Sequence, residues 1–246
     1  MSKHESVLSH ALAIPAFNKL AGKRVVLASA SPRRKEILQI FGLEPEIVPS
    51  KFDENLPYTS FENAHEYPVA TATEKAVEVY QRLFEDEVSP DLVIAADTVV
   101  LSHRLPPTSD VVPSMYPQSF PDIYEKPTSK EDNLRMLLDL NGGTCEVVTG
   151  VSVVYPTITA PGYAIKSIDE RTIVHFQQNS HRILQAYVDS EEGLDRAGGF
   201  AAQGMGGLLL KKIDGDWWNV VGFPAASFFK LVQLLIDEEE DFLSLE

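Results

Sequence analysis

The chain has 246 residues, a formal net charge of -15 and a hydrophobic content of 44%. This length permits a full hydrophobic core in one domain with two lobes, and two independent domains are less expected. The negative charge argues against nucleic acid or an anionic membrane surface as a partner, because both would repel the protein. Any anionic ligand should therefore be small.

Cysteine and histidine usage narrows the chemistry further. The single cysteine, Cys145, rules out an internal disulfide and favours an intracellular, cytoplasmic protein. No partner pattern surrounds it, so a small structural residue is a simpler interpretation than a nucleophile. The six histidines form no metal-binding pair, and no apolar run is long enough to cross a membrane. Residues 7–20, interrupted by Pro15, resemble neither a signal nor a transit peptide.

The first structural unit is a strand followed closely by a helix. Residues 25–28 are apolar and predict a buried strand, Ser31 suits an N-cap, and Pro32 suits the first helical position. The apolar positions that follow have helical spacing and end at Gly42. We therefore expect a sharp strand-to-helix turn at residues 28–31.

The first turn of that helix carries the unfavourable charge. A helix N-terminus already bears partial positive charge, yet Arg33 and Arg34 lie there. A phosphate would reverse the sign of this interaction, since unpaired amides, the hydroxyls of Ser29 and Ser31, and two guanidinium groups converge on one turn. An ordinary capped helix with solvated arginines explains the turn equally well when it is considered alone.

Strand and helix patterns alternate along the rest of the chain, which predicts an α/β fold with a central sheet. In the second half we expect one pair of long strands and one hairpin around Asp214-Gly215. Residues 106–121 are rich in proline and predict a surface loop, and the acidic run 237–241 predicts a solvated helix end or tail. Further strands are expected at 46–48, 92–101, 146–155, 168–176, 208–213 and 217–221, and further helices at 68–83, 129–140, 180–188 and from about Pro224.

Asp97 lies within a nearly continuous apolar run, 92–101. An unpaired ionised acid at a buried position would cost several kcal/mol. Asp97 should therefore face a cation, a metal ion or hydrogen-bond donors, unless it lies at a strand end and turns to solvent. We favour the first interpretation because apolar residues continue on both sides of Asp97.

Two lysines and two further acids complete the candidate site. Lys75 is expected on the predicted helix 68–83 away from its apolar stripe, and Lys126 in the turn before the next helix. Together with Arg33 they could contact phosphates, while Asp97 with Asp53 or Glu54 could hold a hard divalent ion. A triphosphate carries about four negative charges, so a metal and several cations are the usual solution to binding it near carboxylates.

A glycine-rich loop at 198–204 is a weaker signal. It matches neither a Walker A motif nor a Rossmann fingerprint. Its glycines are explained by tight turns alone unless Gln203 lies near the site.

Six blocks of residues stand in a distinctive order along the chain: 27–34, 52–54, 74–76, 96–100, 125–127 and 203–204. Taken together, they closely resemble the Maf family of nucleoside triphosphate pyrophosphatases. The order of all six agrees with the family, and the resemblance extends from about Val25 to the terminal helix. It implies a two-lobed α/β fold related to the inosine triphosphate pyrophosphatases, with an active-site cleft between lobes around a central mixed sheet. It also implies cleavage of a nucleoside triphosphate to the monophosphate and pyrophosphate with Mg²⁺ or Mn²⁺, and a possible homodimer.

The resemblance also implies roles for individual residues. Asp97 takes the position of the catalytic acid and, with Glu54, a role in binding metal or activating water. The positions of Arg34, Thr98 and Gln203 look like those of the branch that prefers thymidine and uridine triphosphates, including modified forms, over a methylated guanosine triphosphate. The phosphate-binding residues implied are Ser29, Arg33, Lys75 and Lys126.

The resemblance therefore predicts an enzyme that removes noncanonical or excess pyrimidine nucleotides. Two alternatives remain open: a pyrophosphatase that prefers 7-methyl-GTP, and a nucleotide-binding regulator of cell division. We expect a single Maf-like domain at 23–246, preceded by an N-terminal extension at 1–22. A proline-rich insertion at about 102–124 and a longer hairpin loop at 155–168 depart from the usual bacterial pattern.

Overall fold

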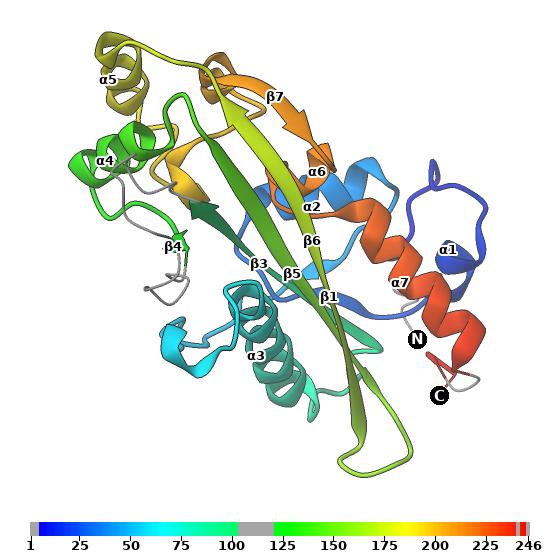
Figure 1. Ribbon diagram of the computed structural model, residues 1–246. Helices are drawn as coiled ribbons and strands as arrows, with labels where there is room; N and C mark the ends of the chain where they lie inside the picture. Colours follow the sequence, from blue (N-terminus) through cyan, green and yellow to red (C-terminus); the bar gives the residue numbers. More distant parts are fainter. Residues whose placement is uncertain (1–4, 103–120, 240–241, 245–246) are drawn as a thin grey trace.

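A computed structural model of the chain describes residues 5–102, 121–239 and 242–244. Its centre is a seven-stranded mixed sheet in the order β2-β1-β3-β5-β6-β7, with β4 also paired to β3 (Figure 1). β1 runs parallel to both β2 and β3, and the other pairs are antiparallel. The strands are β1 (Val25–Leu27), β2 (Glu46–Ile47), β3 (Leu92–Ser102), β4 (Asp122–Tyr124), β5 (Thr144–Pro156), β6 (Tyr163–Phe176) and β7 (Leu210–Asp214).

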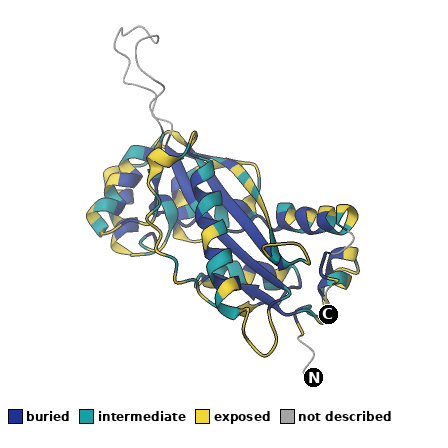
Figure 2. Ribbon diagram, turned by 90° about the horizontal axis from the view of Figure 1, so that it is seen from below, coloured by how far each residue is buried: buried dark blue, intermediate teal, exposed yellow. Residues whose placement is uncertain are grey.

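Helices cover both faces of the sheet, and buried strands run through its centre (Figure 2). β3 and β5 are buried along almost their whole length, whereas β6 is buried only toward its C-terminal end. α3 packs on one face, while α1, α2 and α7 pack with the opposite face of the first strands. α4 and α5 build a separate hydrophobic cluster at the far end of the long strands. The helices are α1 (Pro15–Leu20), α2 (Pro32–Ile40), α3 (Glu66–Leu83), α4 (Lys130–Leu140), α5 (His181–Asp189), α6 (Trp217–Val221) and α7 (Ala225–Glu238), with short 3-10 turns η1 (Tyr58–Ser60), η2 (Ala197–Gly199) and η3 (Met205–Leu209).

One edge of β3 is split between two partners. β1 pairs with residues 92–94 of β3, and β4 pairs with residues 100–102. Between them, no strand of the described chain pairs with residues 95–99 on this edge, although β5 pairs along the whole opposite edge. Ligand sites in α/β sheets commonly lie where neighbouring strands diverge in this way. Asp97 lies in the middle of the split.

Most of the predicted elements are confirmed. The strand-to-helix turn is present, with Ser31 at the N-cap position and Pro32 at the start of α2. The apolar run around Asp97 forms β3. The expected pair of long strands forms β5 and β6, each longer than predicted. At the start of α4, the Ser129 side chain accepts a hydrogen bond from the Asp132 backbone N–H, as a capping residue does.

The predicted hairpin around Asp214-Gly215 is wrong. β7 pairs with β6, and residues 217–221 form the helix α6. The Asp216 side chain caps this helix by accepting from the Trp218 backbone N–H. Asn219 is fully buried, and its side-chain amide donates to the Val147 and Glu170 carbonyls. Capping and these tertiary bonds override the β propensity of the tryptophans and valines in this segment.

Other expectations need correction or lie outside the described part. Lys75 belongs to the buried stripe of α3, not to its solvent side. The last residues of the predicted insertion form β4, while 103–120 lie outside the described residues. Residues near the N-terminus contact the main body, because Val7 forms a bridge with Leu43 and α1 packs against α7. Glu239 at the end of α7 pairs with Lys166, so this part of the acidic run is not simply solvated.

Candidate active site

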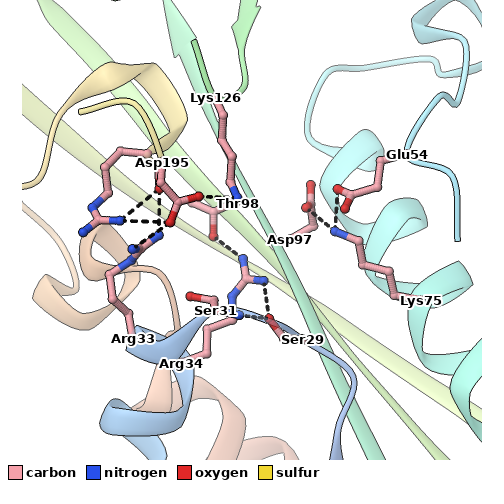
Figure 3. Close-up of polar contacts among 11 residues, drawn as sticks. Ser29, Ser31, Arg33, Arg34, Glu54, Lys75, Asp97, Thr98, Lys126 and Asp195 are labelled. Carbon is pink, nitrogen blue, oxygen red and sulfur yellow. Dashed lines mark hydrogen bonds and ion pairs between the residues drawn. The ribbon is translucent and has the colours of Figure 1, made fainter. Parts of the chain in front are cut away.

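A cavity of about 460 Å³ opens at the split edge of β3. It is formed by the β1–α2 turn, α3, the middle of β3, the turn before α4, the segment before η2, and α6. Eight of the predicted site residues line it, and Figure 3 shows how they converge. Gln203 and Asp53 are not among the residues that line it. The eight are Ser29, Arg33, Arg34, Glu54, Lys75, Asp97, Thr98 and Lys126.

The β1–α2 turn presents polar groups to the cavity. Ser29 is buried, and its Oγ accepts from the Ser31 backbone N–H at 3.2 Å. The Ser31 side chain makes no capping hydrogen bond, and the first turn of α2 contains no acid. The positive end of the α2 dipole is therefore not offset by a local carboxylate, which favours an anion at this turn.

Arg34 crosses from α2 into the cavity. Its guanidinium donates to Ser29 Oγ and Thr98 Oγ1, both at 3.2 Å, and to the Gly222 carbonyl at 3.0 Å. Burial lowers the pKa of Arg34, and the negative charge of Asp97 acts in the opposite direction. These three contacts fix the orientation of the guanidinium group, so Arg34 is held ready to meet an anion at the turn.

Lys75 links the two predicted metal-binding acids on the other side of the cavity (Figure 3). Its Nζ lies 2.8 Å from Asp97 Oδ1 and 2.6 Å from Glu54 Oε2. Burial raises the pKa of the Asp97 carboxyl, although the charges of Lys75 and Arg34 oppose that shift. Asp97 thus meets a cation, as predicted, and its proton affinity is higher than that of an ordinary aspartate.

Close packing of α3 on the sheet brings Lys75 to Asp97. Gly150 of β5 is the register partner of Asp97 on β3. A Cβ at Gly150 would lie 2.4 Å from the Val69 backbone nitrogen and 2.5 Å from the Pro68 carbonyl oxygen. Only glycine permits this approach, because both clashing groups are helix backbone.

A second charged cluster lies at the other end of the cavity. The carboxylate of Asp195 lies 2.5 Å from Lys126 Nζ, 3.4 Å from Arg33 Nη1 and 3.3 Å from Arg196 Nη1. Arg33 Nη2 also donates to the backbone carbonyl of Asp195 at 2.9 Å. The sequence did not predict that Asp195 and Arg196 belong to the site. The glycine pair that follows them was the signal that could have indicated this segment.

Two glycines fix the segment that carries Asp195. Gly198 and Gly199 have φ values of +67° and +73°, which side chains other than glycine rarely adopt. Added Cβ atoms would lie 2.7 Å from Val100 Cγ2 and 2.1 Å from Asn133 Nδ2, respectively. The glycines therefore do more than form a tight turn, since they seat η2 against β3 and α4. Gln203, farther along the loop, is exposed.

The remaining wall of the cavity is apolar. Val100 and Val147 are neighbours on β3 and β5. Phe200, directly after η2, and Val220 of α6 line the same space. The cavity thus combines a cationic turn and a carboxylate pair with an apolar surface. A ligand with an anionic end and a flat, weakly polar end suits this lining.

Fold and site together define an α/β protein with a cavity lined by basic and acidic side chains at a split sheet edge. A family profile described as "Maf-like protein" matches residues 24–235, and the chain belongs to this family.

Named relatives extend the comparison. A dTTP/UTP pyrophosphatase of Schizosaccharomyces pombe is 36% identical over 89% of this chain and 87% of the relative. A dTTP/UTP pyrophosphatase of Clostridium perfringens is 35% identical over 85% of this chain and 96% of the relative. A human "probable bifunctional dTTP/UTP pyrophosphatase/methyltransferase protein" is 42% identical over 89% of this chain. The chain spans 33% of the length of that human protein.

Two features are absent from the described residues 5–102, 121–239 and 242–244. No helix among them is long and apolar enough to span a bilayer. Within the same ranges, no three histidine, cysteine, aspartate or glutamate side chains converge as a ready metal site.

Proposed function

We propose that the protein is a nucleoside triphosphate pyrophosphatase that hydrolyses dTTP and UTP, and modified pyrimidine triphosphates, to the monophosphate and pyrophosphate. The observation that carries the proposal is the Glu54-Lys75-Asp97 cluster facing the uncapped N-terminus of α2 across one cavity. The names of the relatives support the same substrates.

The charges in the cavity favour a divalent cation as cofactor. Five cationic side chains and four carboxylates line it, so the lining carries about one net positive charge. A triphosphate with about four negative charges would leave a large excess of negative charge. Asp97 and Glu54 offer hard oxygen ligands that already converge on one ammonium group, and Mg²⁺ is usually held by one or two carboxylates plus substrate phosphates. We propose that these two residues hold Mg²⁺ or Mn²⁺, which when bound neutralises phosphate charge and acidifies water.

The protein's own groups then perform distinct tasks. Ser29, Arg34 and the α2 N-terminus bind phosphate oxygens, and Lys75 offsets the charge that develops on them. Asp97 accepts a proton from the attacking water, a task for which its raised pKa is suited. The water oxygen bonds to the α-phosphorus, the bond from this phosphorus to the bridging oxygen breaks, and pyrophosphate leaves with that electron pair.

The structure offers a physical basis for preference among bases. Thr98 forms hydrogen bonds with Arg34 and Thr149. The apolar wall begins two residues farther along β3, at Val100. We propose that the base lies on this wall and the phosphates at the turn. A thymine methyl group would gain from apolar contact there.

The proposal is tested by pyrophosphate release from a panel of nucleoside triphosphates with Mg²⁺ or Mn²⁺. Fast, metal-dependent release from dTTP or UTP is expected. Release confined to 7-methyl-GTP would keep the reaction and overturn the base preference. Absence of release from every compound, with nucleotide still bound, would overturn the enzyme and favour the nucleotide-binding regulator.

Three expectations from the sequence stay predictions. They are the homodimer, which light scattering tests, the cytoplasmic location, which cell fractionation tests, and the single domain at 23–246, which limited proteolysis tests.

A further inference from the structure

Asp195 is the contact point of three cationic side chains that come from separate segments. Arg33 extends from the first turn of α2, Lys126 from the turn before α4, and Arg196 from the residue next to Asp195. Arg33 is 162 positions away along the chain. Like charges repel, so these groups would not converge without a carboxylate between them.

The segment that carries Asp195 is firmly seated. Gly198 donates its backbone N–H to the Glu125 carbonyl at 3.1 Å, which ties this segment to the turn that carries Lys126. The Asn133 amide donates to the Gly199 carbonyl at 2.8 Å, and both groups are buried. The backbone carbonyl of Asp195 also accepts from Arg33. Asp195 thus faces the cations from a fixed position.

We propose that Asp195 is a positioning residue that assembles Arg33 and Lys126 into one anion-binding subsite at the mouth of the cavity. This inference rests on the proposed function. Asp195 and Lys126 are well exposed, with side-chain exposures of 59% and 66%. An incoming phosphate can therefore replace the Asp195 carboxylate as the partner of Arg33 and Lys126, while both cations stay in place.

The proposal predicts how binding and turnover separate. Asp195→Asn keeps the size of the side chain and removes the charge that gathers the cations. We expect KM for dTTP to rise about tenfold with kcat nearly unchanged, because the subsite binds ground state and transition state alike. Affinity for inorganic pyrophosphate, measured by calorimetry without any hydrolysis, should fall by a similar factor.

A double-mutant cycle tests whether Asp195 acts through Arg33. Arg33→Gln should also raise KM, and adding Asp195→Asn to it should raise KM by clearly less than the roughly tenfold effect of the single substitution, because one of the cations that Asp195 positions is already absent. Effects that multiply in the double variant would overturn the proposal. An unchanged KM in Asp195→Asn, a lower KM, or a loss confined to kcat would overturn it as well.

Glu191→Gln is the matched control. Glu191 lies four residues before Asp195, has a side-chain exposure of 60%, and pairs with Lys130 and not with a residue that lines the cavity. This substitution removes the same charge from the same segment and should leave KM within about twofold, since an exposed pair outside the cavity contributes little. If the wild-type protein hydrolyses no triphosphate, the proposed function fails. If the wild type is active and the cycle is additive, only the role of Asp195 fails.

Discussion

Lys75 Nζ lies 2.8 Å from Asp97 Oδ1, and both side chains are buried although each carries a charge in its ionised state. The two residues come from a helix and from the strand beneath it, 22 positions apart in the chain. A buried ion pair of this kind contributes little net stability, because desolvation offsets the attraction between the charges. Its position at a split sheet edge is better explained by chemistry.

Asp97→Asn should abolish turnover, even at saturating metal. Loss of a general base typically lowers the rate by about 10²- to 10⁴-fold, and the asparagine keeps the side-chain shape. Pyrophosphate release from dTTP is the measurement. Glu74→Gln is the control, since Glu74 is an exposed acid next to Lys75 on the same helix. Normal turnover in Asp97→Asn would contradict the role of Asp97.

The value of kcat/KM should rise with pH as Asp97 loses its proton, at a pH set by its raised pKa. Burial raises the pKa of this carboxyl and Lys75 lowers it. Lys75→Met should therefore raise the pKa of Asp97 further and move the acidic limb of kcat/KM toward higher pH. The residual activity of the variant is followed across pH at saturating metal. Lys51→Met, at an exposed position outside the cavity, should leave the limb in place, and an identical shift in both variants would contradict the prediction.

The free energy of unfolding should also depend on pH through the titration of Asp97. The pKa of Asp97 is higher in the folded protein than in the unfolded chain, so its contribution is full below the unfolded value and is lost as pH rises through the folded one. Asp97→Asn should therefore flatten this part of the pH dependence of the free energy of unfolding. Urea titrations at several pH values measure it. The same slope in wild type and variant would assign the dependence to other groups.

The Mg²⁺ concentration needed for activity should depend on Glu54 and not on the neighbouring Asp53. Glu54 lines the cavity and contacts Lys75, whereas the Asp53 carboxylate accepts from the Asn55 side chain and does not line the cavity. We expect Glu54→Gln to raise the Mg²⁺ concentration for half-maximal activity by about tenfold. Asp53→Asn should leave it unchanged. Removing metal with a chelator should stop both proteins, and equal effects of the two substitutions would argue against Glu54 as a ligand.

Gly150→Ala should loosen the contact between α3 and the sheet. The added methyl group meets the helix backbone at 2.4 Å, and overpacking of this kind costs about 1 to 3 kcal/mol. Denaturant unfolding measures the loss, and activity should fall with it because Lys75 moves away from Asp97. Gly143→Ala is the control, since its Cβ would meet its nearest neighbour, the Leu140 carbonyl oxygen, at an ordinary 3.5 Å. Equal stability of the two variants would contradict the close packing.

The sequence by itself determined the local parts of this protein. Pro32 after Ser31 specified the start of α2, the apolar run specified β3, and the order of six short blocks specified the family. Each of these signals lies within a few residues, where backbone preference and capping chemistry act directly. The acid inside β3 also signalled that a partner must exist.

Tertiary structure alone decided which groups meet. Residue chemistry alone left Asp53 and Glu54 equivalent, and only the family resemblance selected Glu54. The sequence also placed Lys75 on the wrong side of its helix, because a helix face is defined by what packs against it. Segment 217–221 became a helix through the contacts of Asn219 with distant strands. Asp195 gained its role from Arg33 and Lys126 across long separations in the chain. Such contacts depend on strand register and on close approach at glycines, which no local pattern encodes.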